Sequence, residues 1–217
     1  MLKCQFAINK DQCLKVLCLG SHCDDIEIGC GGTILKLIKK SRDTAFYWVI
    51  FSSDQQRRQE AIDSANAFLM GVKEKNIVIK TFRNSFFPFL GAEIKEYFEK
   101  MKKEFSPDII FTHSRDDRHQ DHRLISDLTW NTFRDHLILE YEIPKYDADL
   151  GSPNFFVHLN RSLCKKKVEI LLNSFVSQKP NHWFTKDSFY SILNIRGIES
   201  NSPSRYAEGF YCRKIAF

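Results

Sequence analysis

Two clusters of histidine and aspartate have the composition of a metal site. The first contains His22, Asp24 and Asp25 and follows the apolar run 16–19. His22 and Asp25 are three residues apart on a tight turn, so both can reach one metal ion, and zinc accepts imidazole nitrogen and carboxylate oxygen. Asp24 then points elsewhere and stays free to act as a base.

The second cluster is the segment 113–122, HSRDDRHQDH, which holds three His and three Asp within ten residues. If the sheet brings the two preceding strands together, His122 completes a site with His22 and Asp25. Two His, one carboxylate and an open position for water form the pattern of a catalytic zinc site. The alternative is that the first cluster only caps a helix beginning near Ile26. The density of the second cluster favours metal binding over capping.

Strands and helices alternate along the chain. Apolar runs predict buried strands at 16–19, 45–51, 76–81 and 108–112, and helical spacing predicts helices at about 33–40, 56–70 and 92–105. We expect a turn at 29–32 before the first helix and a loop at 86–89. This alternation predicts an α/β, three-layer, Rossmann-like fold with a mostly parallel central sheet. Both clusters then lie at carboxyl ends of strands, where open α/β sheets bind ligands.

Length and composition fit one domain of 217 residues, with a core of about 15–135 and a C-terminal part of about 136–217 that completes the pocket and the sheet. The net charge of +5 comes without a long basic run, which argues against nucleic-acid binding but suits an anionic substrate. Seven cysteines without paired spacing indicate reduced thiols and a cytoplasmic protein. We expect no transmembrane segment. The 19 Phe fit an aromatic core and an apolar face for a homo-oligomer.

The two clusters and several later segments together resemble the PIG-L/LmbE-like deacetylases. This family uses zinc to remove acetyl groups from N-acetylglucosamine-type amino sugars and related amides. The resemblance extends from about 16 to 210 and rests on His22-Cys23-Asp24-Asp25, Glu27, Gly29-x-Gly31-Gly32-Thr33, Arg57-x-x-Glu60-Ala61, Asp117-x-His119-x-Asp121-His122, Ser177-Gln178 and Tyr206-Ala207-Glu208-Gly209-Phe210.

The resemblance implies a role for each matching residue. His22, Asp25 and His122 would bind Zn²⁺, and Asp24 would be the general base. His119 would be general acid or oxyanion stabiliser, with Asp121 orienting it. Arg57 would bind a sugar hydroxyl or phosphate.

Other matching or neighbouring positions have two interpretations each. Tyr206 and Glu208 either line the pocket or form an edge strand, and His113 either supports the site or only ends its strand. Cys23 replaces the proline usual in the family, which puts a thiol beside the expected metal. The segment 52–56 also lacks the Gly-Glu that often follows the second strand in the family, so the resemblance does not carry over a substrate contact to this loop.

We therefore expect a zinc-dependent hydrolase that deacetylates an N-acetylated amino sugar, whether free, phosphorylated, nucleotide-linked or lipid-linked. The alternatives are an amidase acting on a bulkier amide conjugate and a non-catalytic zinc-binding protein of the same fold. A dinucleotide-binding domain is a weaker rival, because the glycines at 29–32 do not fit G-x-G-x-x-G and follow the strand at a distance.

Overall fold

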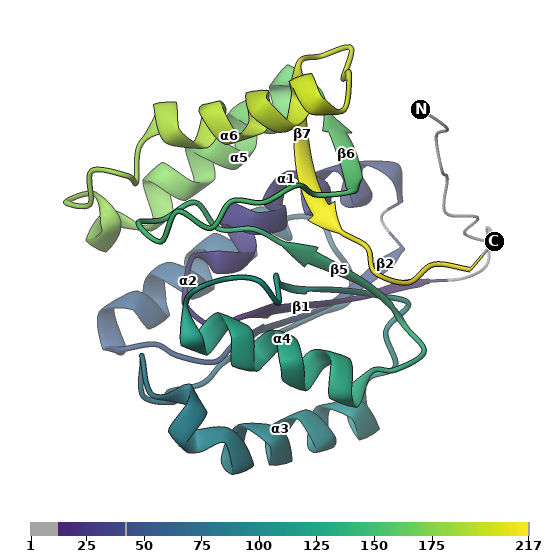
Figure 1. The fold of residues 1–217 in the computed structure, drawn as a ribbon, viewed down its shortest axis with the longest axis vertical. Coiled ribbons are helices and arrows are strands. Elements are labelled where there is room, and N and C mark those ends of the chain that lie inside the picture. Colours follow the sequence, from purple (N-terminus) through teal and green to yellow (C-terminus); the bar gives the residue numbers. More distant parts are fainter. Residues whose placement is uncertain (1–12, 42, 217) are drawn as a thin grey trace.

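The computed structural model describes residues 13–41 and 43–216, which form seven strands and six α-helices that alternate from β1 to β5 (Figure 1). The strands are β1 (Leu14–Gly20), β2 (Thr44–Ile50), β3 (Lys75–Ile79), β4 (Ile109–His113), β5 (Leu137–Tyr141), β6 (Phe155–Leu159) and β7 (Tyr206–Tyr211). The helices are α1 (Asp25–Lys40), α2 (Gln55–Phe68), α3 (Gly91–Glu104), α4 (Gln120–Thr132), α5 (Arg161–Ser174) and α6 (Lys186–Glu199), with two 3₁₀ turns at Phe87–Leu90 and Val176–Gln178.

All seven strands belong to one sheet with the order β3-β2-β1-β4-β5-β7-β6. The first five strands run parallel to one another, and β7 pairs antiparallel with both β5 and β6. The strands β2 and β4 are buried along their whole length, as expected for strands covered on both faces. The prediction of an α/β fold with a mostly parallel sheet is confirmed.

The helices cover both faces of the sheet and make three layers. In Figure 1, α1, α2, α5 and α6 lie on one side of the sheet, and α3 and α4 lie on the other. Each side has its own apolar cluster, one built around residues such as Trp48 and Phe68 and the other around residues such as Phe51 and Phe98. Within the described residues, no helix combines the length and apolar character needed to cross a bilayer.

The first helix differs from its prediction. The helix α1 begins at Asp25 rather than Thr33, and the glycines expected to form a turn lie inside it. They serve close packing: a Cβ on Gly29 would come within 3.0 Å of three side-chain atoms of Tyr141 on β5, and one on Gly31 would meet Phe68. Each glycine inside the helix costs about 1 kcal/mol of stability relative to alanine. The helix accepts this cost because its axis lies close to the sheet here.

The C-terminal part completes the sheet, and β7 lies inside the sheet rather than at its edge. Glu208 on β7 is buried, and its carboxylate accepts hydrogen bonds from the backbone N–H groups of Gly32 and Thr33 in α1 at 2.7 and 2.6 Å. The ammonium of the buried Lys167 on α5 lies 2.6 Å from the same carboxylate. Glu208 therefore ties β7, α1 and α5 together.

Candidate active site

Three side chains from two neighbouring strand ends converge on one point. His22 follows β1, Asp25 is the first residue of α1, and His122 lies in the first turn of α4 after β4. Because β1 pairs with β4, the two segments lie side by side. His22 Nδ1 is 3.1 Å from His122 Nε2 and 3.4 Å from Asp25 Oδ2, and His122 Nε2 is 3.6 Å from Asp25 Oδ2. Three potential ligand atoms thus form a compact triangle.

The backbone before α1 is held by polar groups that fix this triangle. Asp25 Oδ2 accepts the N–H of His22 at 2.6 Å, so the carboxylate and the imidazole share one tight turn. His113 Nε2 accepts the N–H of Ser21 at 2.9 Å. Asp24 occupies the N-cap position of α1 but makes no side-chain capping bond. The capping alternative therefore does not account for the Asp24 carboxylate.

Each of the two converging histidines has a carboxylate on its far ring nitrogen. Asp117 Oδ2 lies 2.8 Å from His122 Nδ1, and Asp121 Oδ2 lies 3.3 Å from His22 Nε2. Carboxylates at these positions hold a proton on the outer nitrogens, which leaves the two inner nitrogens with lone pairs that face each other at 3.1 Å. Two facing lone pairs beside a carboxylate repel unless a cation lies among them, so these residues fit a metal ion.

The electrostatics of this pair also favour a positive charge. Burial disfavours an imidazolium at His22, but Asp25 and Asp121 outweigh burial and raise the pKa of His22 to about 10. Burial, together with the neighbouring His113, lowers the pKa of His122 to about 3. The surroundings thus hold one cation at the triangle, as a proton on His22 or as a metal ion. Either one neutralises the carboxylate of Asp25.

Asp24, the expected base, is buried next to the triangle and pairs with Arg57. Arg57 Nη2 donates to Asp24 Oδ1 at 2.8 Å from the first turn of α2. Burial raises the pKa of Asp24, while the guanidinium partly offsets the rise. The structure thus places Arg57 against the expected base, where it fixes the carboxylate. The predicted contact of Arg57 with a substrate stays a prediction.

His119 is the N-cap residue of α4, and its ring packs edge-on to His22 with 4.9 Å between centroids. His119 Nδ1 accepts the backbone N–H of Asp121 at 3.2 Å, so the ring of His119 carries its proton on Nε2. The carboxylate of Asp121 does not reach the His119 ring. It accepts the N–H groups of Ser85 and Phe87 at 2.6 and 3.1 Å and faces His22.

Besides the group of His22, His119 and His122, which contains two members of the triangle, two more groups in the described residues have a metal-like geometry. Asp25, His113 and His122 form one, but His113 Nε2 is already used by the Ser21 N–H. The other is formed by three aspartates, at 117, 147 and 149, and the ammonium of Lys145 lies among them. In the triangle, by contrast, both histidines have a carboxylate on the outer ring nitrogen, which leaves the inner nitrogens for a metal ion.

Cys23 is buried, and its thiol points to the backbone carbonyl of Ser52 at 3.5 Å. Burial raises the pKa of this thiol, so it remains a thiol rather than a thiolate at neutral pH. The cysteine that replaces the usual proline is therefore a packing residue next to the site.

Sequence reasoning gave no role to Asp117, although this residue belongs to the second family motif. The signal that could have revealed its role is its position five residues before His122, at the start of the loop that leads into α4. The backbone donors at Ser85 and Phe87 carry no such signal, because any residue supplies an N–H group. Ser85 has a left-handed backbone (φ 65°), which directs its N–H toward Asp121.

Comparison with known proteins agrees with this geometry. A family model described as PIG-L, GlcNAc-PI de-N-acetylase, matches residues 17–133, which contain every member of the triangle. The chain belongs to the PIG-L family. Family membership supports a deacetylase, and the buried His and Asp group is able to hold the metal ion on which such an enzyme depends.

Solved structures show that the fold is shared over nearly the whole chain. A conserved protein of Thermus thermophilus is 16% identical, with a TM-score of 0.72 and coverage of 94% of this chain and 96% of its own. The N,N'-diacetylchitobiose deacetylase of Pyrococcus horikoshii is 22% identical, with a TM-score of 0.64 and coverage of 90% and 82%.

GalB, the 4-carboxy-2-hydroxymuconate hydratase of Pseudomonas putida, is 15% identical, with a TM-score of 0.71 and coverage of 94% and 98%. One fold thus occurs in both a deacetylase and a hydratase. At these identities the likeness to solved structures shows the fold, and the activity has to be argued from the site.

Proposed function

We propose that this protein is a zinc-dependent deacetylase of an N-acetylated amino sugar, with His22 Nδ1, Asp25 Oδ2 and His122 Nε2 holding the ion. The observation that carries the proposal is the triangle of three ligand atoms, backed by a carboxylate on the far nitrogen of each histidine. A zinc ion at this position would polarise the acetyl carbonyl and make bound water more acidic.

Asp24 is the residue placed to take the proton from the attacking water. It is buried beside the triangle, and Arg57 binds one of its oxygens. This contact fixes the plane of the carboxylate and therefore the direction of the other oxygen. A general base must lie within hydrogen-bonding reach of the proton that it removes, and Asp24 directly precedes the ligand Asp25. Its raised pKa makes it a better proton acceptor than an exposed aspartate.

His119 is suited to stabilise the oxyanion. With Nδ1 accepting the Asp121 N–H, the neutral ring can donate only from Nε2. A ring nitrogen of His119 lies within 4.8 Å of one from His22 and one from His122, close enough to reach the carbonyl oxygen of a substrate bound at the triangle. The proton that Asp24 has taken from water can then pass to the leaving amine.

The test is acetate release from a panel of N-acetylhexosamine compounds that are free, phosphorylated, nucleotide-linked or lipid-linked. It would be run on metal-analysed protein, with and without a chelator. If a chelator stops the release of acetate and added zinc restores it, the result supports the proposal and ranks the substrates. No release from protein carrying one zinc per chain would favour the bulkier-amide or non-catalytic alternative. No zinc binding would refute the assignment of the three ligands.

A further inference from the structure

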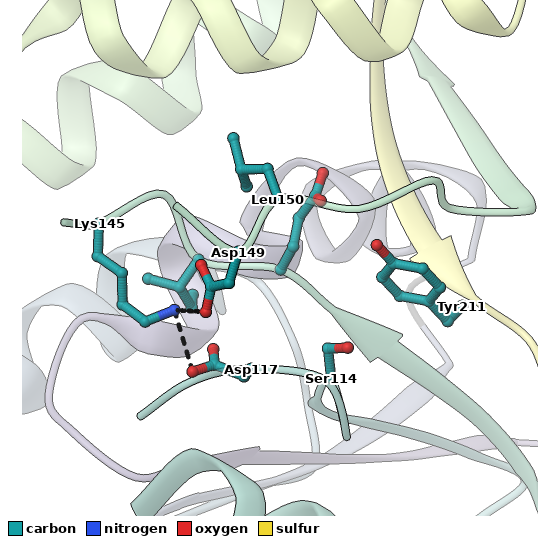
Figure 2. Close-up of a pocket in the computed structure, with 8 residues that line it drawn as sticks. Ser114, Asp117, Lys145, Asp149, Leu150 and Tyr211 are labelled. Atoms are coloured by element: carbon teal, nitrogen blue, oxygen red, sulfur yellow. Dashed lines mark hydrogen bonds and ion pairs between the residues drawn. The ribbon is translucent and has the colours of Figure 1, made fainter. Parts of the chain in front are cut away.

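The segment between β5 and β6 is connected to the triangle of proposed metal ligands through Lys145, which contacts the carboxylate bound to His122. Its side chain is only 12% exposed, and its ammonium lies 2.6 Å from Asp149 Oδ2 and 3.0 Å from Asp117 Oδ1. Figure 2 shows Lys145 reaching between these two carboxylates at the edge of a small cavity that Ser114, Leu150 and Tyr211 also line. None of the three triangle residues lines this cavity.

Asp117 connects Lys145 to the triangle. Its Oδ2 accepts the Nδ1–H of His122 at 2.8 Å, and its Oδ1 accepts the backbone N–H of His119 at 2.8 Å as well as Lys145. One buried carboxylate therefore fixes the His122 ring, the N-cap residue of α4 and the ammonium of Lys145. The position of Asp117 determines which ring nitrogen of His122 faces the triangle.

A second contact ties the same segment to the same loop. Asp149 accepts the backbone N–H of Arg118 at 2.8 Å, while it also binds Lys145. The loop 117–119 is thus held by the segment 145–149 at two points, a side-chain ion pair and a side-chain to backbone bond. Lys145 is the cation that allows Asp117 and Asp149 to lie near each other without mutual repulsion.

We propose that Lys145 is a positioning residue of the metal site: through Asp117, it fixes the His122 ring with Nε2 directed at the ion. The proposal rests on the proposed metal site but not on the substrate. Loss of the ammonium leaves the carboxylates of Asp117 and Asp149 facing each other, and their repulsion moves Asp117 away from His122. The Nδ1 proton is then no longer held, and His122 becomes a poorer ligand.

The experiment compares Lys145→Met and Lys145→Arg with the native chain and with Lys167→Met as a matched control. Lys167 also forms a buried ion pair, 2.6 Å from Glu208, but packs α5 against α1 and β7 and contacts none of the triangle residues. The readouts are the zinc dissociation constant, measured by competition with a chromophoric chelator, and thermal unfolding of the metal-free protein.

We expect Lys145→Met to weaken zinc binding by about tenfold or more, the range seen when a group that orients a metal ligand is removed. Lys145→Arg should retain most of the affinity, because a guanidinium can bridge both carboxylates. Lys167→Met should lower the unfolding temperature of the metal-free protein while zinc affinity stays near the native value.

Native zinc affinity in Lys145→Met would overturn the proposal. So would an equal loss of affinity in Lys145→Met and Lys167→Met, since the cause would then be general destabilisation. A chain that shows the expected series of affinities but releases no acetate from any compound would support the role of Lys145 and refute the proposed deacetylation.

Discussion

Replacing Asp24 by Asn tests the proposed base with little disturbance of the structure. The amide oxygen of Asn can still accept the Arg57 Nη2–H that Asp24 Oδ1 now accepts at 2.8 Å, so the side chain keeps its anchor. The three proposed ligands are untouched. The variant loses only a carboxylate that can take a proton.

The expected loss of turnover follows from the role of a buried general base. A positioned base contributes about 10²–10⁴-fold, which corresponds to about 3–5 kcal/mol of activation free energy. Because Asp24 is only 5% exposed, bulk water has poor access to replace it. We expect Asp24→Asn to fall within this range in an acetate-release assay, with zinc content measured on the same sample.

The matched control is Asp54→Asn, the same change of a carboxylate to an amide at the N-cap of α2. Asp54 caps α2 by accepting the N–H of Arg57, and Asn caps helices equally well, so this variant should keep native turnover and stability. Native turnover in Asp24→Asn with zinc bound would refute the role of Asp24 as base. Loss of zinc from Asp24→Asn would instead assign the effect to metal binding.

Three further predictions concern packing and the metal. Gly29→Ala should destabilise the fold by about 1–3 kcal/mol and lower the unfolding temperature by several degrees, because the new methyl group meets Tyr141. Gly91→Ala should be neutral or slightly stabilising, because nothing lies within 4 Å of a Cβ at that position. Equal melting curves for the two variants would contradict the packing argument. Zinc at about 100 times its dissociation constant should stabilise the protein by about 2.7 kcal/mol in a thermal-shift assay, and a chelator should reverse the shift; an unchanged curve would argue against a site in the native state. Asp121→Asn should weaken zinc binding by about tenfold in chelator competition, because the carboxylate behind His22 is lost, and native affinity would show that His22 needs no such partner.

The positions of the site residues could be predicted because the strands that precede them could be recognised in the sequence. Continuous apolar runs such as 45–51 can only be buried strands in an alternating chain, and parallel strands bring their carboxyl ends to one edge. Because β1 and β4 are neighbours, the segments that follow them, with His22 and His122, lie at the same edge of the sheet. The family motifs supplied the individual roles, which spacing alone did not.

The parts that could not be predicted depend on contacts between segments distant in sequence. Glycines at 29–32 look like a turn from local preference, and their place inside a helix is explained by close contacts with distant residues such as Tyr141 at Gly29 and Phe68 at Gly31. The pairing of Arg57 with Asp24 depends on where α2 begins relative to β1. Lys145 lies in a segment without periodicity, so nothing in its sequence surroundings indicated that it would reach Asp117.

The interior position of β7 has a consequence for synthesis on the ribosome. Strands β1 to β5 can pair as they emerge, but β6 has no partner in the sheet until β7 arrives to lie between it and β5. Glu208 on that late strand also supplies the acceptor for N–H groups of α1, one of the first helices made. A nascent chain that stops before Tyr206 therefore exposes the outer edge of β5 and leaves Lys167 without its carboxylate, which makes it a substrate for chaperones and proteases until the last strand is inserted.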